Sequence, residues 1–278
     1  MRTRLLSLSV RWVACLIALS CLAQSRVPSA PALDQLTPEQ GQAFLAGFRA
    51  ARLTSALCLR FEIIHKPRKG DSLAAVKGTL WAASYGSDQL LRGEIKDTQD
   101  KSTFAFITIK SGKESRVWIS RHGAPAQELS GKAPLIPLAE GLLLTPFDLQ
   151  LPFTHWPATA YLSTEKRRHP VHVFDALNQP GHEPAKVNFA IDHVYGVLIQ
   201  ATYFDTNGKK TRTMQIEEFS KVDEQWMLAA CSVLNENTRD ADLLRITEAA
   251  LGERFAPQTF EPATLAQPAV QPANFKKL

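Results

Sequence analysis

Val187-Asn-Phe-Ala-Ile-Asp192 and Leu198-Ile-Gln-Ala-Thr-Tyr203 lead to the turn Asp205-Thr-Asn-Gly208, and the chain returns as Arg212-Thr-Met-Gln-Ile-Glu-Glu-Phe219. Apolar and polar residues alternate along these runs, loosely in the second, and a period of two is typical of strands that bury one face. Asn-Gly between two such runs is the strongest short-range hairpin signal, because both residues tolerate positive φ. A further apolar run follows at residues 226–234. The region therefore predicts an antiparallel meander with one covered face.

The first half of the chain carries the same signal. In Leu57-Cys-Leu-Arg-Phe-Glu-Ile63 the apolar side chains fall on every second residue, so they share one face of a strand. Further strands are predicted in residues 75–83, 89–96, 103–110 and 115–120, with turns between them. The chain is therefore mainly β, and the helices described next make its fold class α+β.

One helix is predicted near the start of the chain. Thr37-Pro-Glu-Gln40 combines an N-cap threonine, a proline in the first turn and a glutamine that can close a capping box. Phe44 and Phe48 then lie on the same side of this helix. Because no helical partner is near in the sequence, we expect this side to lie on the sheet.

The middle of the chain is richer in proline and aromatic residues. Residues 145–157 read Thr-Pro-Phe-Asp-Leu-Gln-Leu-Pro-Phe-Thr-His-Trp-Pro, and a short helix is predicted around residues 147–151. Phe147, Phe153 and Trp156 are candidates for a mobile lid, because the prolines restrict the backbone and favour a discrete hinge. A fixed loop that plugs one end of the sheet is the alternative.

The two ends of the chain read as separate segments. Residues 1–23 combine three arginines, no acidic residue and an apolar run from Trp12 to Ala23, which predicts a secretory signal peptide. Cleavage after Ala23 and lipidation at Cys21 are both open. Residues 24–36 form a Pro/Ala leader, and we expect residues 263–278, a Pro/Ala/Gln tail, to be disordered.

The net charge of the chain bears on nucleic-acid binding, and its cysteine content bears on disulfide formation. The chain has 32 basic and 27 acidic residues; without the signal segment 29 basic residues face 27 acidic ones, a net charge of +2. Nucleic-acid binding therefore has no compositional support. Of the four cysteines, Cys58 and Cys231 would remain after cleavage. We expect two separately buried thiols, with a disulfide as the alternative in an oxidising compartment.

Catalytic and metal-binding patterns are weak. The sequence holds no Gly-x-Ser-x-Gly motif. His169 and His172 would face opposite sides of a strand, which argues against a shared metal. We therefore expect no enzyme activity, no cofactor and no metal. A hydrolase on a β scaffold, using His155, His169 or Asp175, is the weakest alternative.

The order of these pieces resembles the LolA/LolB-like outer-membrane lipoprotein-sorting proteins over residues 37–262. The segments that carry the resemblance are the capped helix 37–53, Val117-Trp-Ile119 before His122-Gly123, Leu142-Leu-Leu-Thr-Pro-Phe-Asp-Leu149, His155-Trp-Pro157, and the late run through residues 187–192, Ala201-Thr-Tyr-Phe-Asp205, Gly208, Phe219 and Trp226.

The resemblance implies a strongly curved antiparallel sheet that forms a half-open barrel, with helices covering its concave face. In such proteins the apolar concave face accepts the acyl chains of lipoproteins in transit to the outer membrane. The resemblance also favours a strand over a helix for residues 240–251. An arginine on the strands ties down the lid in this family; Arg60 and Arg92 are candidates here by strand position.

An apolar concave face can hold an acyl chain without directional groups, since burying each CH₂ contributes about 0.8 kcal/mol. The predicted lining residues are Leu59, Phe61, Leu80, Phe104, Phe106, Trp118, Phe189 and Tyr203. The alternative for each of them is a purely structural role, as a core side chain packed under a helix. The predicted lid residues are Phe44, Phe48, Phe147, Phe153 and Trp156.

The expected function is that of a monomeric periplasmic carrier, which binds acyl chains of lipids or lipoproteins and moves them towards the outer membrane. Its expected protein partners are an inner-membrane donor and an outer-membrane acceptor, with no nucleic acid. The alternative is an envelope sensor or interaction protein that uses the same curved sheet to bind a membrane partner.

Overall fold

The computed structural model describes residues 34–71, 73–97 and 103–278. The expected signal peptide in residues 1–23, the anchor at Cys21 and the leader up to residue 33 lie outside these residues. They stay predictions. Among the described residues, no helix is both long enough and apolar enough to cross a membrane.

Strands dominate the described chain and join into one antiparallel sheet. Their bounds are β1 (Ala56–Lys66), β2 (Leu73–Tyr85), β3 (Asp88–Asp97), β4 (Thr103–Ser111), β5 (Arg116–Arg121), β6 (Gln127–Glu128), β7 (Ala158–Lys166), β8 (Pro170–Leu177), β9 (Lys186–Asp192), β10 (Leu198–Phe204), β11 (Lys210–Val222), β12 (Gln225–Asn235), β13 (Ala241–Glu253) and β14 (Lys276–Lys277). The order in this 14-stranded sheet is β6-β5-β4-β3-β2-β1-β13-β12-β11-β10-β9-β8-β7, and β14 pairs with β13 beside this path.

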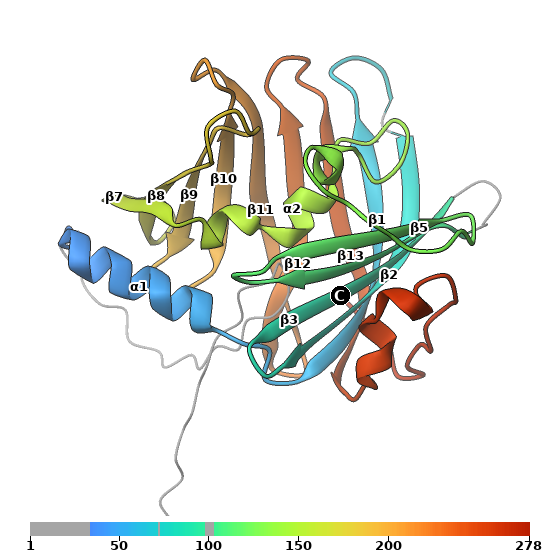
Figure 1. The fold of residues 1–278 in the computed structure, drawn as a ribbon. Helices are drawn as coiled ribbons and strands as arrows, with labels where there is room; N and C mark the ends of the chain where they lie inside the picture. Colours follow the sequence, from blue (N-terminus) through green and yellow to red (C-terminus); the bar gives the residue numbers. More distant parts are fainter. Residues whose placement is uncertain (1–33, 72, 98–102) are drawn as a thin grey trace, which may run out of the picture.

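The sheet is strongly curved and does not close, with β6 and β7 at its two ends. In Figure 1 the strands β10–β12 stand upright, whereas β3 and β5 run across at a steep angle to them. Both α helices lie on the side towards which the sheet bends. The predicted α+β fold, a half-open barrel with helices over its concave face, is confirmed.

The meander that decided the fold class forms as predicted. Strands β9 to β12 follow one another in the sheet, and the hairpin between β10 and β11 pairs Tyr203 with Arg212. At its tip the Gly208 amide bonds to the Asp205 carbonyl at 3.0 Å, and Gly208 has a φ of 75°. Residues 240–251 fall in β13, so the strand interpretation is confirmed.

The helical segments also match the sequence pattern. They are α1 (Pro38–Ala50) and α2 (Pro146–Gln150), with the 3-10 turns η1 (Ala133–Leu135), η2 (Pro152–His155), η3 (Pro257–Phe260) and η4 (Pro262–Thr264). Thr37 caps α1, and Gln40 closes the capping box as predicted. Thr145 and Asp148 form a second capping box at α2, which fixes the start of that short helix in the middle of the chain.

Two glycines let side chains cross the strong bend of the sheet. A Cβ atom on Gly78 would lie 2.3 Å from the ring of Phe61, and one on Gly93 would lie 2.8 Å from Ile107. Phe61 pairs with Gly78 across β1 and β2, and Leu80 pairs with Gly93 across β2 and β3. Large side chains on one strand therefore pack over the bare backbone of the next.

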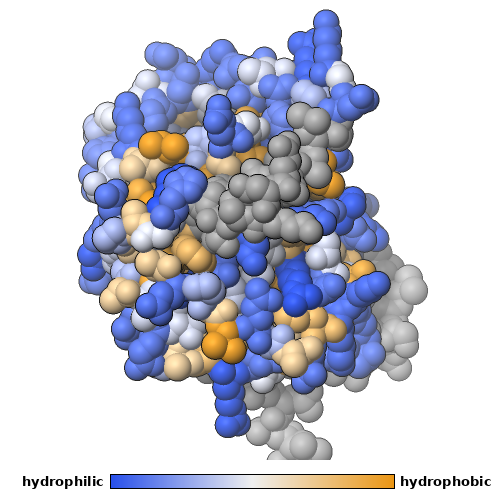
Figure 2. Space-filling view, turned by 90° about the vertical axis from the view of Figure 1, so that its right-hand side faces the viewer, coloured by the Kyte–Doolittle hydropathy of each residue, from blue (hydrophilic) through white to orange (hydrophobic). Residues whose placement is uncertain are grey.

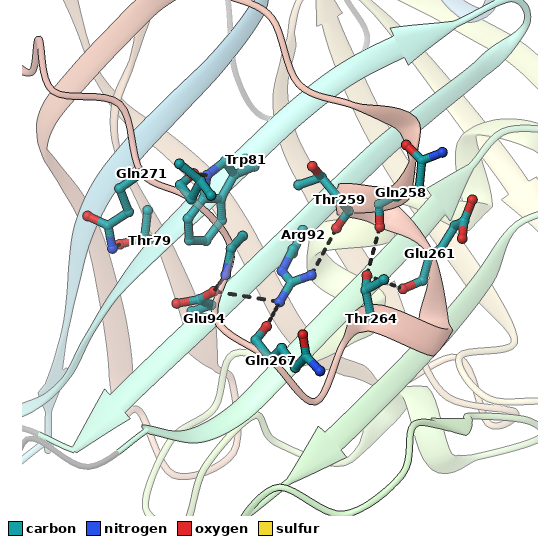
Figure 3. A network of polar contacts seen from close by, with 12 residues as sticks. Thr79, Trp81, Arg92, Glu94, Gln258, Thr259, Glu261, Thr264, Gln267 and Gln271 are labelled. Atoms are coloured by element: carbon teal, nitrogen blue, oxygen red, sulfur yellow. Dashed lines mark hydrogen bonds and ion pairs between the residues drawn. The ribbon is translucent and has the colours of Figure 1, made fainter.

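Residues 254–278, which we call the C-terminal strap, are packed rather than disordered. Arg92 of β3 donates hydrogen bonds to the carbonyls of Thr259 and Gln267, and Glu94 accepts one from the Ala269 amide (Figure 3). Leu265 is fully buried. The expectation of a disordered tail after residue 262 was wrong, because strand residues far away in the sequence, not the tail's own composition, supply its partners.

The strap covers the convex face of β1–β3. Its Phe260 joins a separate apolar cluster with Cys58, Trp81 and Ala250, apart from the main core. Cys231 lies in the main core on the other face, so the expectation of two separate buried thiols is confirmed. On the side of the molecule shown in Figure 2, hydrophilic residues dominate the described surface and hydrophobic ones form small separate groups.

Candidate functional site

The concave face of the sheet is a continuous apolar wall. Leu59, Phe61, Leu80, Phe189 and Tyr203, all predicted as lining residues, belong to one buried cluster and are at most 4% exposed. They come from β1, β2, β9 and β10, and the period of two along each strand turns them to the same side. The structure thus brings these residues together on the concave face.

Two other predicted lining residues lie on the convex face. Phe106 pairs with Glu94, and Trp118 pairs with Thr108, whereas their neighbours Ile107 and Ile119 belong to the concave cluster. The guanidinium of Arg92 lies 5.7 Å from the Phe106 ring. The assignment of both aromatics to the lining was therefore wrong: alternation separates two faces but does not say which one is concave. Phe104 lies in β4, and its side chain falls outside the described residues.

The predicted lid residues cover the wall from two segments of the chain. Phe48 of α1 and Phe147 and Phe153 of the segment 136–157 are buried in the main cluster, with Phe44 and Trp156 partly buried against it. We call α1 and residues 136–157 the lid. The lid contributes aliphatic residues too, namely Leu138, Leu142, Leu144, Leu149 and Leu151.

Aromatic rings join lid and wall directly. The Phe153 ring lies 5.4 Å from Phe189 and 5.9 Å from Tyr203, and the Phe147 ring lies 5.9 Å from Tyr203. These separations suit edge-to-face contacts, which add about 0.5–1.5 kcal/mol each beyond the area they bury. The lid side chains therefore occupy the space in front of the wall that an apolar ligand would need.

Charged side chains of the strands tie the lid to the wall. Arg212 of β11 donates to the Leu143 carbonyl at 2.6 Å and to the Asp148 carboxylate at 2.6 Å. Asp242 of β13 accepts the Leu143 and Leu144 amides at 2.6 and 2.8 Å, and its other oxygen lies 2.8 Å from His65 Nδ1. These ties hold one short stretch of the lid, residues 143–148, from two strands.

The arginine that ties the lid is therefore not one of the two expected by strand position. Arg60 pairs with Glu248 and lies over the Phe275 ring of the strap at 4.0 Å. Arg92 is bonded within the strap on the convex face. Arg212 was missed because its lid partner Asp148 is 64 residues away; the usable signal was its position opposite Tyr203 in the predicted hairpin.

The helix α1 rests on a histidine pair at the β8 end of the wall. His172 Nε2 lies 2.7 Å from His193 Nδ1, His172 Nδ1 lies 3.0 Å from the Thr164 hydroxyl, and the Phe44 ring is 4.5 Å from His172. Burial, together with the neighbouring His193, lowers the pKa of His172 to about 4. His172 is therefore neutral at pH 7, which suits the apolar helix face above it.

The geometry does not assemble the enzyme alternative. Asp175 is paired with Lys186 and Asn188, His169 meets the Tyr195 ring, and His155 lies beside Arg49, each in its own surroundings. Burial first, then the charges of Arg49 and Arg52, lowers the pKa of His155 to about 4. Within residues 34–71, 73–97 and 103–278, no three His, Cys, Asp or Glu side chains are grouped to hold a metal.

A cavity of about 260 Å³ opens where the lid meets one end of the sheet. It is lined mainly by apolar residues of β5, of the β6 region and of the lid, among them Ile119, Leu129, Ile136 and Pro146. Ile119 belongs to the concave cluster, and Pro146 begins α2. The cavity therefore gives solvent a path to the margin of the wall beside the lid segment that Arg212 holds.

Comparison with solved structures confirms the resemblance seen in the sequence at the level of the fold. A domain of Vibrio parahaemolyticus named as an outer membrane lipoprotein-sorting protein matches with a TM-score of 0.67 at 14% identity, over 82% of this chain and 96% of that chain. A LolA superfamily protein of Nitrosomonas europaea matches with a TM-score of 0.59 at 12% identity, over 80% of this chain and 97% of that chain.

A third solved structure with the same fold carries no function in its name. It is a DUF1329 family protein of Desulfovibrio piger, with a TM-score of 0.67 at 12% identity, covering 82% of this chain and 98% of that chain. No protein-family profile and no curated protein matches the sequence. At these identities the likeness shows the fold alone.

Proposed function

We propose that this chain is a non-enzymatic periplasmic carrier, which binds the acyl chains of lipids or lipoproteins on its concave face and moves them towards the outer membrane. The observation that carries the proposal is a continuous apolar wall covered by a lid that polar ties hold over residues 143–148. The proposed lining is Leu59, Phe61, Leu80, Phe189 and Tyr203, and the lid bears Phe44, Phe48, Phe147, Phe153 and Trp156.

Energetics support an exchange between lid and ligand. An acyl chain of a dozen or more carbons gains on the order of 10 kcal/mol from burial, before association and ordering costs of several kcal/mol. The lid's own leucines and phenylalanines make comparable contacts in the closed state, so a ligand chain can replace them without leaving the wall exposed. For such an exchange, residues 143–148 must first be released from Arg212 and Asp242.

The fold neighbours support the direction of this proposal. Two of them are named for lipoprotein sorting or for the LolA superfamily, and this chain spans nearly their full length. The sequence pattern of residues 1–23 supports export. A donor protein at the inner membrane and an acceptor at the outer membrane follow from a carrier role.

Chain-length dependence of binding tests the proposal. Nile red, a neutral dye, is bound to the purified protein and displaced with fatty alcohols of eight to sixteen carbons. If the wall takes up the chain, affinity rises about fourfold for each added CH₂ until the wall is filled. Native mass spectrometry of protein purified from the cell envelope should also show a bound lipid. Absence of both dye binding and bound lipid, with recovery of one membrane protein in pull-downs, would instead support the sensor alternative.

A further inference from the structure

A buried carboxylate stands in the middle of the apolar interface between lid and wall. Asp148 of α2 is fully buried, in a cluster that also contains Phe147 and Phe153. One of its oxygens accepts the Arg212 guanidinium at 2.6 Å and the Thr145 amide and hydroxyl at 2.8 and 2.7 Å. The other oxygen has no hydrogen-bond partner. A carboxylate in such a place costs free energy unless it is paired, so Arg212 is its essential counter-charge.

The wall side of this contact consists of two hydrogen-bond donors. Arg212 and Tyr203 are opposite one another on β11 and β10, and the Arg212 guanidinium lies 5.8 Å from the Tyr203 ring. The Tyr203 hydroxyl is buried and has no hydrogen-bond partner. Burial first, and then the charge of Asp148, raises the pKa of Tyr203 well above its ordinary value. The hydroxyl therefore stays protonated and able to donate.

Opening of the lid separates these groups. Asp148 belongs to α2 and leaves with it, whereas Arg212 and Tyr203 belong to rigid strands and remain on the wall. Arg212 then stays beside the Tyr203 ring at the apolar wall, and an unpaired charge beside an apolar surface is costly, so a new anion is favoured there. The guanidinium fork suits a carboxylate or phosphate better than a neutral group.

We propose that Arg212 and Tyr203 form a binding site for the anionic head group of an acyl-chain ligand, a carboxylate or phosphate, and that Asp148 takes its place when the lid is closed. This inference rests on the proposed function and adds the charge of the ligand to it. The acyl chain then follows the wall through Phe189, while the head group stays beside the strand that ties the lid. Asp148 thus competes with the ligand for Arg212, and the unpaired Tyr203 hydroxyl is a second donor that the head group can use.

The test compares amphiphiles that share one chain and differ in the head group. Dodecanoate, dodecyl phosphate and dodecanol displace Nile red from the wild-type protein, from Arg212→Gln and Tyr203→Phe, and from Arg116→Gln as control. Arg116 is an exposed arginine whose guanidinium lies over the Trp118 ring on the convex side, so its variant loses the same charge elsewhere. Inorganic phosphate without an acyl chain is the fourth probe.

The proposal expects the wild type and Arg116→Gln to bind both anionic amphiphiles at least tenfold tighter than dodecanol. Arg212→Gln loses a lid tie, which changes the affinities for all three amphiphiles together, so the readout is the ratio of the anion affinities to the dodecanol affinity. That ratio should fall to about one in Arg212→Gln and fall part of the way in Tyr203→Phe, which keeps the ring. Equal affinity for dodecanol and the anions in the wild type, or an unchanged preference in the folded variants, overturns the anion site and leaves the carrier function standing. Displacement by inorganic phosphate as effective as by dodecyl phosphate also overturns it. If dodecanol and the anions all fail to bind, the carrier function itself is wrong.

Discussion

The two covers of the sheet differ in how much of their contact is apolar packing and how much is polar. The lid covers the concave face mainly with leucine and phenylalanine side chains and is held by polar ties to Arg212 and Asp242. The C-terminal strap covers the convex face with fewer apolar anchors, and buried polar side chains of the strands hold its backbone. Backbone-directed bonds fix one geometry, whereas apolar packing accepts a substitute of similar shape.

The difference indicates which cover can move. Arg92, Glu94 and Trp81 each bind strap backbone groups, so displacement of the strap leaves several buried polar groups without partners. Displacement of the lid also frees Arg212 and Asp242, but most of the surface it exposes is apolar, and an acyl chain is suited to cover such a surface. We therefore infer that the convex face is the structural side of the sheet and the concave face the exchangeable one.

The largest effect is expected on the convex face, from Arg92→Ala. Arg92 is 1% exposed, and its loss leaves Glu94 buried without its cation and the Thr259 and Gln267 carbonyls without their donor. The free energy of unfolding should fall by about 3–5 kcal/mol in urea titrations. Arg116→Ala, an exposed arginine of the same sheet, should leave the unfolding midpoint nearly unchanged. If both variants lost the same free energy of unfolding, the bonds of Arg92 to the strap would not stabilise the fold.

Asp242→Ala should give the next largest effect, on the concave face. The Leu143 and Leu144 amides lose their acceptor, which should cost about 2–3 kcal/mol. Hydrogen exchange at these amides should accelerate, and Nile red should bind faster because the lid opens more often. Asp205→Ala removes a carboxylate that also accepts two backbone amides, but in an exposed turn, and should leave dye uptake as it is. Unchanged uptake in Asp242→Ala would contradict the view that this tie limits lid opening.

Local patterns in the sequence predicted the helices and strands, but not which residues of a strand lie on the concave face of the sheet. The hairpin around Gly208 and the helix capped by Thr37 depend on neighbours in the chain, so their residues suffice to identify them. The sides of Phe106 and Trp118 could not be assigned, because both faces of this sheet are covered and both are therefore rich in apolar residues. Alternation alone carries no information about curvature.

Long-range partners explain the remaining differences between prediction and structure. The strap holds four prolines and few large apolar residues, so its own composition suggests disorder. Its order comes from Trp81, Arg92 and Glu94. The role of Arg212 also depends on a partner that is remote in the chain, Asp148. The lid aromatics were found because proline and aromatic residues concentrate in one segment, which is a local signal.

Acid should loosen the lid at the α1 end through His172. Burial and His193 depress the pKa of His172 to about 4 in the folded state, against 6.5 for a histidine in water, so the unfolded chain binds the proton more readily. This contribution to stability is complete above pH 6.5 and is lost as pH falls towards 4, by about 2 kcal/mol between pH 7 and pH 5. His172→Phe should flatten that part of the pH profile of unfolding.

His155, whose pKa is also lowered to about 4, provides the control for that experiment. His155→Asn should reduce the pH dependence as well, but it lies in η2 and leaves the contact between Phe44 and His172 in place. Hydrogen exchange around Phe44 in the middle of α1 at pH 5 should therefore respond to His172→Phe, whereas His155→Asn, beside Arg49, should act at the last turn of the helix. Equal responses would assign the acid sensitivity to the molecule as a whole.

The smallest effect is expected from a pair of glycines in α1. Gly47→Ala meets no atom within 4 Å and should stabilise the helix by about 0.5–1 kcal/mol, because alanine loses less backbone entropy. Gly41→Ala places a methyl group 2.4 Å from Tyr161 of β7 and should lift α1 off the sheet, with a loss of stability instead. If α1 opens as a rigid part of the lid, Gly47→Ala should leave Nile red uptake unchanged while Gly41→Ala increases it. A slower uptake in Gly47→Ala would show that α1 unfolds during opening, and the lid would then exchange by local unfolding rather than by moving away from the wall.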